Sequence, residues 1–570
     1  MGTPFIEFKD FSFRYDSQAE PTLKHLNVTI QKGEKILVLG PSGSGKSTFG
    51  KVLNGLIPNA FEGEVTGTAT LNGQSLVEQS IASLSYQVGT VLQDTSAQFV
   101  GMTVAEDVAF ALENDQVGHE QLHEQVAYWA EQLNLVALAK QSPQDLSGGQ
   151  KQRVSMAGVL IDQPEILLFD EPLANLDPET GYQTMALIDR LHRELETTIV
   201  MIEHRLEDVL SQPVDRVLVF DQGQIVFDGK AADLLASNRL MEVGIREPLY
   251  VSAIHYATQT LEGFTALDHV SQVEGQELAI QLQTWNQQLD FPVREHSTQP
   301  LLCLDKIEFQ YPLTERKALA NLSTTIYQGE MVSIVGTNGA GKTTLAKIIA
   351  GFLPVTSGDI YWQGDNITQD KILQRASRIG YVMQDPNQMI SQHLIFDEVA
   401  LGLRLRGVEE EQVREKVLEV LRICGLYAFR EWPISALSYG QKKRVTIAAI
   451  LVLEPTLLIL DEPTAGQDYH HYHEFMQFVR SLNERGMTIL MITHDLQLML
   501  EYTDRTLVVV DGQLLADTTP FEVLTSLELT QKASLRPTTL YVLAERMGIE
   551  DPTRFVQNFI QYERQVSEHA

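Results

Sequence analysis

Two glycine-rich segments of this 570-residue chain have the residue types and spacing of loops that hold phosphate groups. They are Gly40-Pro41-Ser42-Gly43-Ser44-Gly45-Lys46-Ser47-Thr48 and Gly336-Thr337-Asn338-Gly339-Ala340-Gly341-Lys342-Thr343-Thr344. Both fit the pattern G-x-x-x-x-G-K-[ST], in which flexible glycine backbone wraps around phosphate oxygens. Lys46 and Lys342 would reach the β- and γ-phosphates of a nucleotide, while Ser47 and Thr343 would ligate Mg²⁺. A chance glycine-rich turn is disfavoured because the pattern occurs twice.

The neighbouring sequence supports both loops. Each loop follows an apolar run, Lys35–Leu39 or Met331–Val335, which predicts a buried strand. Each loop precedes a predicted helix, over residues 47–56 or 343–352. The free N–H groups and the dipole at the start of such a helix favour an anion. The strand–loop–helix order is therefore the order that phosphate binding needs.

An aspartate followed by a glutamate ends an apolar run at two places, Asp170-Glu171 and Asp461-Glu462. A continuous apolar run is typical of a strand in a parallel sheet that is covered on both faces. At the strand ends the aspartates suit Mg²⁺ ligation. The glutamates suit polarising the water that attacks the γ-phosphate. Acidic residues that merely end a strand at the surface are the alternative, which the equivalent placement in both copies disfavours.

Two further kinds of polar residue end apolar runs. Gln93 and Gln384 are placed to bridge Mg²⁺ or the attacking water to a mobile segment, although Gln-Asp is a common dipeptide. His204 and His494 are placed to hydrogen-bond the γ-phosphate and to stabilise the transition state. A lone histidine is more often structural, but the position at a strand end in both copies favours the functional interpretation.

Aromatic and serine–glycine motifs complete the candidate sites. Tyr15 and Tyr311 are predicted to stack on an adenine ring, the alternative being a half-buried strand tyrosine. The segments Ser147-Gly148-Gly149-Gln150 and Ser438-Tyr439-Gly440-Gln441 are predicted helix N-termini that bind an anion. A helix cap without a ligand is the alternative for these segments. Tyr439 replaces a glycine, so its side chain would either weaken anion approach or pack beside the nucleotide.

The motifs recur as a duplication of a whole domain. Gln93 and Gln384, like Asp170 and Asp461, are 291 positions apart. We predict an α/β fold with one domain at 1–235, its appendage and a linker at 236–300, a second domain at 301–525 and a second appendage at 526–570. The appendages are predicted to be places where the two halves meet, the alternative being solvent-exposed helix pairs.

Composition narrows the function classes. The net charge of −32 argues against general nucleic-acid binding and against docking on anionic lipid. Two cysteines, Cys303 and Cys424, indicate a reducing compartment without a disulfide framework. The first residues lack the pattern of a secretory signal, and no run of about 18 apolar residues occurs. Any membrane role is therefore expected to come through a partner chain.

Taken together, the two sets of motifs resemble those of the ATP-binding cassette (ABC) ATPases. The signatures LSGGQ and LSYGQ and the other motifs occur in the family's order, and residues 174–177 and 465–468 look like its D-loops. The resemblance implies a mixed core sheet, an antiparallel β subdomain, a helical signature subdomain and a small C-terminal appendage in each copy. It also implies that ATP and Mg²⁺ bind. In the family, two cassettes face head to tail, so each ATP would lie between one copy's loop and the other copy's signature within this chain.

A narrower resemblance is to the ATPases of energy-coupling factor (ECF) importers. It rests on residues 98–110, 388–399 and 463–468. It implies a transmembrane coupling subunit and a small hydrophobic substrate-binding membrane subunit as partners, at the cytoplasmic face of a prokaryotic cell membrane. The cargo would be a water-soluble vitamin, its precursor, or a transition metal ion such as cobalt or nickel.

The residues just after each glutamine are where such a membrane partner would dock. Apolar and amide side chains cluster in residues 93–102 and 384–393. Helices of the coupling subunit are predicted to enter grooves there. Phe99 and Met389 are the apolar side chains that we expect to matter for coupling.

Other ABC proteins remain as alternatives. Sugar-importer ATPases also fuse two cassettes, but commonly with one degenerate site, whereas both motif sets are complete here. Translation-associated members carry a basic helical arm between the cassettes, and residues 236–300 are not basic. DNA-repair members insert coiled coils or zinc modules, for which this chain has no heptad run and too few cysteines. The complete motif sets predict two competent hydrolytic sites.

Overall fold

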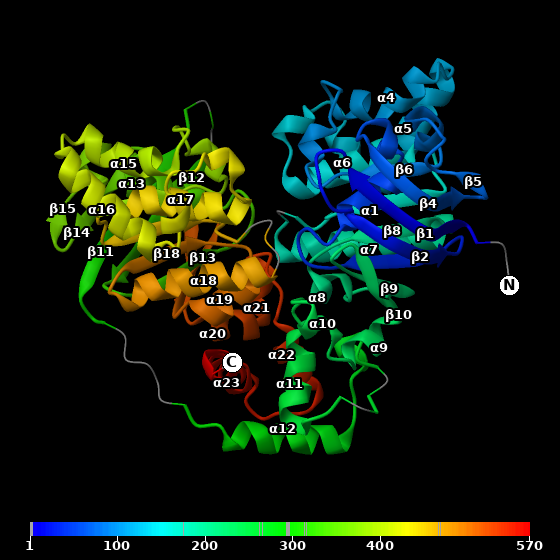
Figure 1. Ribbon diagram of the computed structural model, residues 1–570. Helices are drawn as coiled ribbons and strands as arrows, with labels where there is room; N and C mark the ends of the chain where they lie inside the picture. Colours follow the sequence, from blue (N-terminus) through cyan, green and yellow to red (C-terminus); the bar gives the residue numbers. More distant parts are fainter. Residues whose placement is uncertain are drawn as a thin grey trace. The chain divides into compact units, whose positions relative to one another are not determined.

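The computed structural model describes residues 4–174, 176–261, 263–264, 266–291, 297–312, 314, 316–464, 467 and 469–569. The chain divides into two compact units (Figure 1). The first unit contains residues 1–282 with 468–470, and the second contains residues 283–467 with 471–570. Within the predicted D-loops, Asn175, Ala465, Gly466 and Asp468 lie outside the described residues.

An antiparallel sheet opens the first unit, in the order β2-β1-β4-β5. Its strands are β1 (Ile6–Tyr15), β2 (Leu23–Ile30), β4 (Gly63–Leu71) and β5 (Gln74–Ser75). One face of β1 is buried, because successive side chains of a strand point to opposite faces. Phe8 and Phe13 lie on this buried face, which confirms the predicted one-sided strand.

A six-stranded sheet forms the core of the first unit, in the order β10-β9-β3-β8-β7-β6. Its strands are β3 (Lys35–Leu39), β6 (Val88–Val91), β7 (Ile166–Asp170), β8 (Thr198–Ile202), β9 (Arg216–Asp221) and β10 (Gln224–Gly229). The neighbours are parallel except for β9 and β10, which pair antiparallel. Every residue of β3 and β8 is buried, which explains their nearly continuous apolar sequences.

Helices cover this sheet and form the appendage of the first unit (Figure 1). They are α1 (Lys46–Leu53), α2 (Leu56–Asn59), α3 (Ile81–Ser85), α4 (Val104–Asn114), α5 (His119–Gln132), α6 (Gly148–Leu160), α7 (Pro178–Leu195), α8 (Leu206–Val209), α9 (Ala231–Leu235), α10 (Arg239–Glu242) and α11 (Leu249–Thr258). The helix after the first glycine-rich loop ends at Leu53 and not at Leu56 as predicted. The reason is Gly55, whose φ of 74° is incompatible with a continuing right-handed helix.

The second unit repeats this topology, with sheet orders β12-β11-β14-β15 and β16-β17-β18-β13-β19-β20. Its strands are β11 (Pro300–Gln310), β12 (Lys317–Tyr327), β13 (Met331–Val335), β14 (Ser357–Trp362), β15 (Asp365–Asn366), β16 (Ile379–Val382), β17 (Leu457–Asp461), β18 (Thr488–Ile492), β19 (Arg505–Val510) and β20 (Gln513–Thr518). The antiparallel sheet and the mixed core sheet predicted for each copy are therefore confirmed. We call residues 4–235 the first repeat and residues 301–525 the second repeat.

The helices of the second unit follow the same order. They are α13 (Lys342–Ala350), α14 (Ile372–Arg375), α15 (Ile395–Leu405), α16 (Glu410–Ile423), α17 (Tyr439–Leu451), α18 (Tyr469–Glu484), α19 (Leu496–Tyr502), α20 (Pro520–Thr525), α21 (Leu527–Lys532), α22 (Thr539–Arg546) and α23 (Pro552–His569). The helix after the second loop ends at Ala350 rather than at the predicted residue 352, because Gly351 lies at φ 85°.

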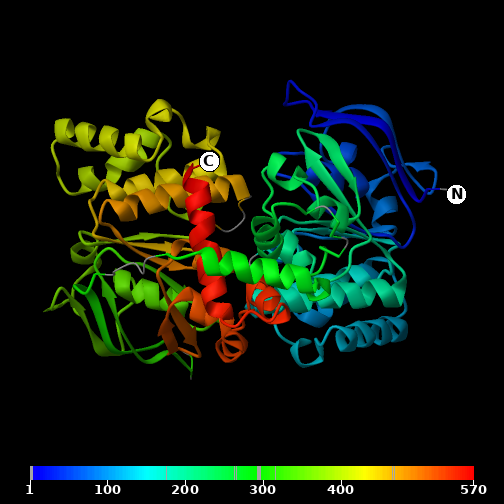
Figure 2. The same ribbon diagram turned by 90° about the horizontal axis from the view of Figure 1, so that it is seen from below.

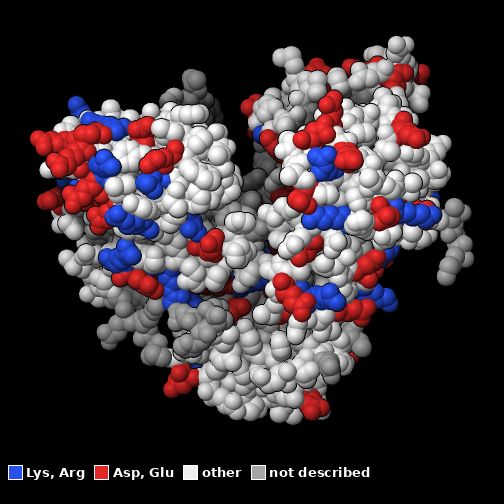
Figure 3. Space-filling model, viewed as in Figure 1, with Lys and Arg blue, Asp and Glu red and all other residues white. Residues whose placement is uncertain are grey.

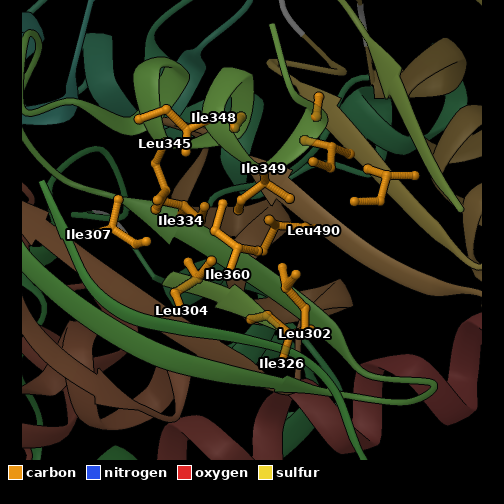
Figure 4. Close-up of a cluster of buried hydrophobic side chains, with 14 of the residues drawn as sticks. Leu302, Leu304, Ile307, Ile326, Ile334, Leu345, Ile348, Ile349, Ile360 and Leu490 are labelled. Atoms are coloured by element: carbon orange, nitrogen blue, oxygen red, sulfur yellow. The ribbon is translucent and has the colours of Figure 1, made fainter. Parts of the chain in front are cut away.

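One hydrophobic core holds the two sheets and α13 of the second repeat together (Figure 4). Side chains of β11, β12 and β14 point toward those of α13 and the core sheet (Figure 4): Leu302, Leu304, Ile307, Ile326 and Ile360 lie near Ile334, Leu345, Ile348, Ile349 and Leu490. This packing positions α13, and so positions the glycine-rich loop that precedes it.

The segment between the repeats contains a helix that its polar, glutamine-rich composition did not predict, α12 (Gln276–Gln288). The end of this helix lies beside α23 (Figure 2). There Trp285 packs edge-on against three aromatic residues of α23, Phe555, Phe559 and Tyr562. The Asn558 side-chain amide of α23 also donates to Asn286 Oδ1 at 2.8 Å. Residues 283–288 therefore belong to the packed structure of the second unit. The boundaries predicted for the domains and appendages remain predictions.

Acidic residues outnumber basic residues in this chain, 75 to 43. Asp and Glu side chains gather over α15 and α16 (Figure 3), in line with the net charge of −32. Among the described residues, no helix combines the length and apolar character needed to cross a membrane.

Phe49 tests how the core positions the first loop. Its ring is fully buried in α1 and packs against Phe8 and Phe220 at centroid distances of 5.1 and 5.3 Å. We predict that Phe49→Ala destabilises the first unit by about 3–5 kcal/mol, because it leaves a cavity. Urea unfolding followed by hydrogen exchange and mass spectrometry would assign the change to its unit. The matched variant Leu345→Ala in α13 should shift only the second unit, and a Phe49→Ala effect below about 1 kcal/mol would contradict the prediction.

Candidate functional site

In both repeats the lysine of the glycine-rich loop points into the loop. Lys46 Nζ donates to the carbonyl oxygens of Gly40 at 2.7 Å and Pro41 at 2.9 Å. Lys342 Nζ donates to the equivalent carbonyl oxygens, of Gly336 and Thr337, both at 2.9 Å. The two lysines are 4% and 6% exposed. Each ammonium group therefore lies inside its loop, where an anion would meet it.

Some loop glycines are required because neighbouring backbone lies close to them, while the space around Gly43 is open. A Cβ atom on Gly40 would collide with the carbonyl oxygen of Phe220, and one on Gly336 would collide with that of Val509. Gly43, by contrast, has a φ of 78°, and a Cβ atom added there would have nothing within 4 Å. Since α1 and α13 begin at the loop lysines, the first N–H groups of each helix lack an acceptor within their own helix, and such helix starts favour an anion.

An unpaired polar group supports anion binding by the first loop. Ser44 is 3% exposed, and its Oγ is buried without a hydrogen-bond partner among the described residues. A buried hydroxyl without a partner costs free energy, so such a group usually serves a ligand or an ordered water. The equivalent residue of the second loop is Ala340, which offers no such group.

The glutamate after the first acidic strand contacts two other residues predicted for the same site. Glu171 Oε1 lies 2.9 Å from His204 Nε2, and Glu171 Oε2 accepts a hydrogen bond of 2.6 Å from Gln93 Nε2. The glutamate backbone has a φ of 51°, which turns its side chain toward the end of β8. Gln93, Glu171 and His204 are therefore brought together at one edge of the sheet, the edge where parallel strands end.

The second repeat places its glutamate and histidine in the same way. Glu462 has a φ of 46°, and its Oε1 lies 3.2 Å from His494 Nε2. Its Oε2 accepts a hydrogen bond of 3.3 Å from the backbone N–H of His494. Gln384 contributes a backbone carbonyl, which accepts a hydrogen bond of 3.2 Å from the Tyr439 hydroxyl.

The aspartates end their strands beside the loops. Thr343 Oγ1 lies 3.5 Å from Asp461 Oδ1, and the Tyr381 hydroxyl donates to Asp461 Oδ2 at 2.7 Å. Burial raises the pKa of Asp461, and the hydrogen bonds from Tyr381 and Thr343 oppose this shift. Burial and the neighbouring Glu171 carboxylate also raise the pKa of Asp170. A bound cation would favour both ionised carboxylates, and the hydroxyl and carboxylate oxygens are the ligands that Mg²⁺ prefers.

The serine–glycine segments are helix N-termini, as predicted. Ser147 caps α6 and Ser438 caps α17, each through a capping box with a glutamine three residues on. Ser147 N–H donates to Gln150 Oε1 at 2.9 Å, and Ser438 N–H donates to Gln441 Oε1 at 3.0 Å. The cap is therefore present in both repeats, while anion binding by these segments remains a prediction.

The two tyrosines predicted to stack on adenine lie next to the loops. The Tyr15 hydroxyl is 3.2 Å from Thr48 Oγ1, and the Tyr311 hydroxyl is 3.0 Å from Thr344 Oγ1. Tyr15 is partly buried and Tyr311 is 39% exposed, so part of each side chain remains accessible. The alternative of a structural strand tyrosine is compatible with the same contacts, and stacking on a base remains a prediction.

The sequence of this chain is similar to those of known proteins. Residues 23–174 and 319–465 match the profile of the ABC transporter family. A protein of Enterococcus faecalis is 55% identical over 566 residues, covering 99% of this chain and 100% of the relative. Proteins of Lactobacillus johnsonii and Clostridium perfringens are 54% and 48% identical, covering 99% and 98% of both chains. All three are provisionally named ABC transporter ATP-binding proteins.

The chain belongs to the ABC transporter family. It is an ATP-binding subunit with two tandem ABC ATPase domains. Residues 237–309 match a second profile, described as ATP-binding cassette cobalt transporter. One similar solved structure is cbiO1 from Clostridium perfringens, described as part of the ABC transporter complex cbiONQ. It is 32% identical and aligns with a TM-score of 0.39. The alignment covers 44% of this chain and 100% of cbiO1.

Four residues of the ABC ATPase hydrogen-bond to predicted site residues or to the turn that follows a site glutamate, and sequence reasoning missed them. They are Glu203, Arg205, Tyr381 and Lys443. Glu203 and Arg205 flank a predicted site residue, and Lys443 follows the signature by two positions. Their proximity to motifs was the available signal. Their hydrogen-bond partners lie too far along the chain to be inferred from spacing.

Glu462 gives the ABC ATPase a pH-dependent stability. Burial raises the pKa of Glu462 to about 8, from an ordinary value of 4.5. Below pH 4.5 the folded and unfolded chains both hold the proton, so the group has no effect on stability. Between pH 4.5 and about 8 the unfolded chain releases the proton while the folded chain keeps it, so stability falls as pH rises. Above that range both states are ionised and the loss is constant.

We therefore predict that Glu462→Gln, which cannot ionise, stabilises the nucleotide-free second unit at pH 8. The unfolding midpoint should rise by about 2–4 °C, and the gain should vanish toward pH 4. Calorimetry at several pH values would measure this. The control is Glu431→Gln, at a side chain that is 81% exposed. A gain that is the same at every pH would contradict the prediction.

Proposed function

We propose that this ABC ATPase hydrolyses ATP at two sites and so energises an importer of the ECF type. The proposed catalytic residues are Gln93, Glu171, His204, Gln384, Glu462 and His494. The proposed Mg²⁺ ligands are Ser47, Gln93, Asp170, Thr343, Gln384 and Asp461. The observation that carries the hydrolytic proposal is that each partly buried strand-end glutamate lies within 3.2 Å of its histidine.

In the proposed mechanism each glutamate accepts a hydrogen bond from a water aligned for attack on the γ-phosphorus and takes up the proton that this water loses. The histidine beside it donates a hydrogen bond to the γ-phosphate oxygens as negative charge shifts during transfer. The loop lysine and the backbone N–H groups at the helix start hold the β- and γ-phosphates in line. Mg²⁺, when bound, neutralises phosphate charge. The buried aspartates and the loop hydroxyls would hold it.

The family resemblance leads us to propose that each site is completed by the signature of the other repeat. One site would combine Lys46, Ser47, Gln93, Asp170, Glu171 and His204 with Ser438 and Gly440. The other would combine Lys342, Thr343, Gln384, Asp461, Glu462 and His494 with Ser147 and Gly149. ATP would then hold two cassettes of one chain together, and loss of the γ-phosphate would let them part. Such a two-state element is able to drive a membrane partner.

The two-site proposal predicts how glutamate substitutions combine. Glu171→Gln and Glu462→Gln should each lower kcat but leave measurable turnover, because the other site still works. In the double variant kcat should fall at least about a hundredfold, because no glutamate then remains to polarise the water. Steady-state phosphate release from the purified full-length chain would measure this. If one single variant abolishes turnover while the other leaves it intact, two working sites are excluded.

The proposed importer class is supported by the match of residues 237–309 to a cobalt-transporter profile and by the ECF-like segments of the sequence. The partners would be a transmembrane coupling subunit and a small hydrophobic substrate-binding membrane subunit. The chain would work at the cytoplasmic face of a prokaryotic cell membrane. Its cargo would be a vitamin, a vitamin precursor or a transition metal ion. The excess of acidic side chains supports a role without nucleic acid (Figure 3).

An exposed apolar pair supports docking of the coupling subunit near Gln93. Val100 is 61% exposed and Met102 is 84% exposed, just before α4. Phe99 is half-buried, and Met389 accepts a hydrogen bond of 3.1 Å through its sulfur from the Met383 N–H. Substitutions at these last two residues would therefore disturb the fold as well as the proposed groove. Met102 is the cleaner position for a test.

We predict that Met102→Glu uncouples the ATPase from its membrane partners, because a charge would replace an apolar contact. A tagged chain pulled down from its own membranes in mild detergent should recover two small hydrophobic proteins, and Met102→Glu should reduce this recovery at least about fivefold. ATP turnover of the free chain should stay unchanged. The matched control is Met241→Glu, at a side chain that is 66% exposed in α10. Equal recovery with both variants would argue against docking at Met102, and wild-type recovery of ribosomal proteins alone would argue against transport.

A further inference from the structure

The turn that follows each catalytic glutamate is held from a different side in the two repeats. In the first repeat it is held by the segment that follows β8. Glu203 Oε2 accepts a hydrogen bond of 3.1 Å from the Leu173 N–H, and the Arg205 guanidinium donates to the Leu173 carbonyl oxygen at 3.0 Å. Glu203 is 3% exposed and also accepts from the backbone N–H of His204 at 2.8 Å. The turn and the histidine segment are therefore joined through one buried carboxylate.

In the second repeat the corresponding turn is held by the signature helix. Lys443 of α17 donates to the carbonyl oxygens of Pro463 at 2.6 Å and Glu462 at 3.2 Å. Lys443 is 2% exposed. The residues at the positions of Glu203 and Arg205 are Thr493 and Asp495, so the second repeat lacks that acid–base pair in its sequence.

The residue equivalent to Lys443 in the first repeat is Gln152 of α6. Gln152 is also buried, at 5% exposure, but its Nε2 has no hydrogen-bond partner among the described residues. Burial at this position is thus similar in the two repeats. What differs is the hydrogen bonding from the signature helix to the turn after the catalytic glutamate.

A second departure of the same helix strengthens this connection. Tyr439, where the first repeat has Gly148, places its ring 5.3 Å from Lys443 Nζ. Its hydroxyl donates to the carbonyl oxygen of Gln384 at 3.2 Å. The start of α17 therefore contacts the glutamine segment through Tyr439, while Lys443, one turn later, contacts the catalytic turn.

A buried lysine needs compensation, and its surroundings supply it. Burying an ammonium group is costly unless the charge is hydrogen-bonded or paired. Besides the two carbonyl oxygens and the Tyr439 ring, the carboxylates of Glu462 and Asp385 favour the charged form of Lys443. Burial is the larger influence and lowers the pKa of Lys443 to about 8. A glutamine of similar shape fits the same place in the first repeat at no such cost, so packing alone does not require a lysine.

We propose that Lys443 is a positioning residue for Glu462, joining the signature helix of the second repeat to that repeat's own catalytic turn. Glu203 holds the first repeat's turn from the histidine segment instead. The inference rests on the proposed function, in which both turns belong to hydrolytic sites. Under the same proposal the signature at Ser438 serves ATP bound by the first loop. Binding of ATP at that site would then influence the position of Glu462 through α17. The first repeat has no equivalent hydrogen bond from Gln152.

The test is to remove the hydrogen bonds of Lys443 or Glu203 by substitution in chains where only one catalytic glutamate is active. In a full-length Glu171→Gln chain, turnover reports on Glu462, and Lys443→Gln should lower kcat about tenfold while the KM for ATP changes less than about twofold. In that background Glu203→Gln should have little effect. In a Glu462→Gln chain, turnover reports on Glu171. There Glu203→Gln should lower kcat, and Lys443→Gln should have little effect. Lys442→Gln, which removes the neighbouring charge of α17, is the matched control.

A purely structural lysine would lower turnover in both backgrounds together, and that result would overturn the proposal. So would no effect of Lys443→Gln in either background. Lys443→Met, which keeps most of the length without the charge, should reproduce the glutamine variant because it also loses the hydrogen bonds. If the double variant Glu171→Gln/Glu462→Gln turned over ATP as fast as the wild type, the proposed function would fail instead.

Hydrogen exchange gives a readout that does not depend on turnover. In the nucleotide-free full-length chain, both Lys443 variants should speed exchange in a peptide covering residues 462–464 by at least about threefold, because the turn loses its anchor. Glu203→Gln should speed exchange around Leu173 and not around residues 462–464. Unchanged exchange at 462–464 in both Lys443 variants would overturn the proposal even if turnover changed.

Discussion

Both candidate sites depend on the backbone conformation of one residue, the glutamate that follows the acidic strand. Glu171 and Glu462 have φ values of 51° and 46°, a region that residues other than glycine rarely occupy. Their backbone N–H groups donate to the carbonyl oxygens of Ile202 and Ile492 on the neighbouring strand. The turned backbone directs each carboxylate toward the histidine at the end of that strand. A conformation of this kind persists only where surrounding contacts hold it.

The contacts that hold it are buried charged groups, and they differ between the repeats. Glu203 accepts hydrogen bonds from Leu173 and His204 in the first repeat, while Lys443 donates to Glu462 and Pro463 in the second. Each group offsets the cost of its burial with hydrogen bonds to backbone. A duplicated ABC ATPase domain can thus keep one glutamate–histidine geometry and hold it from different neighbouring segments of the chain. Fold similarity alone does not reveal such a difference.

Local pattern predicted most of the architecture. The strands β3 and β13 cover the apolar runs predicted for them, because short apolar runs between turn residues have few other ways to be buried. The helix starts at Ser147 and Ser438 were also predictable, since capping depends on residues within one turn. The ends of α1 and α13 were placed too far along the chain, past Gly55 and Gly351. The packing of α12 was missed because Trp285 finds its aromatic partners about 270 positions later.

The sequence by itself determined the two-copy organisation, the ABC family and the types of residue that make up the candidate sites, because these follow from motif order and spacing. Only the tertiary structure decided which side chains hold those residues in place. Tyr381 reaches Asp461 across neighbouring parallel strands, and Lys443 reaches Pro463 from a helix packed on the sheet. Such contacts depend on strand register and on the distance between a helix and a sheet. Neither quantity is encoded in the spacing of residues along the chain.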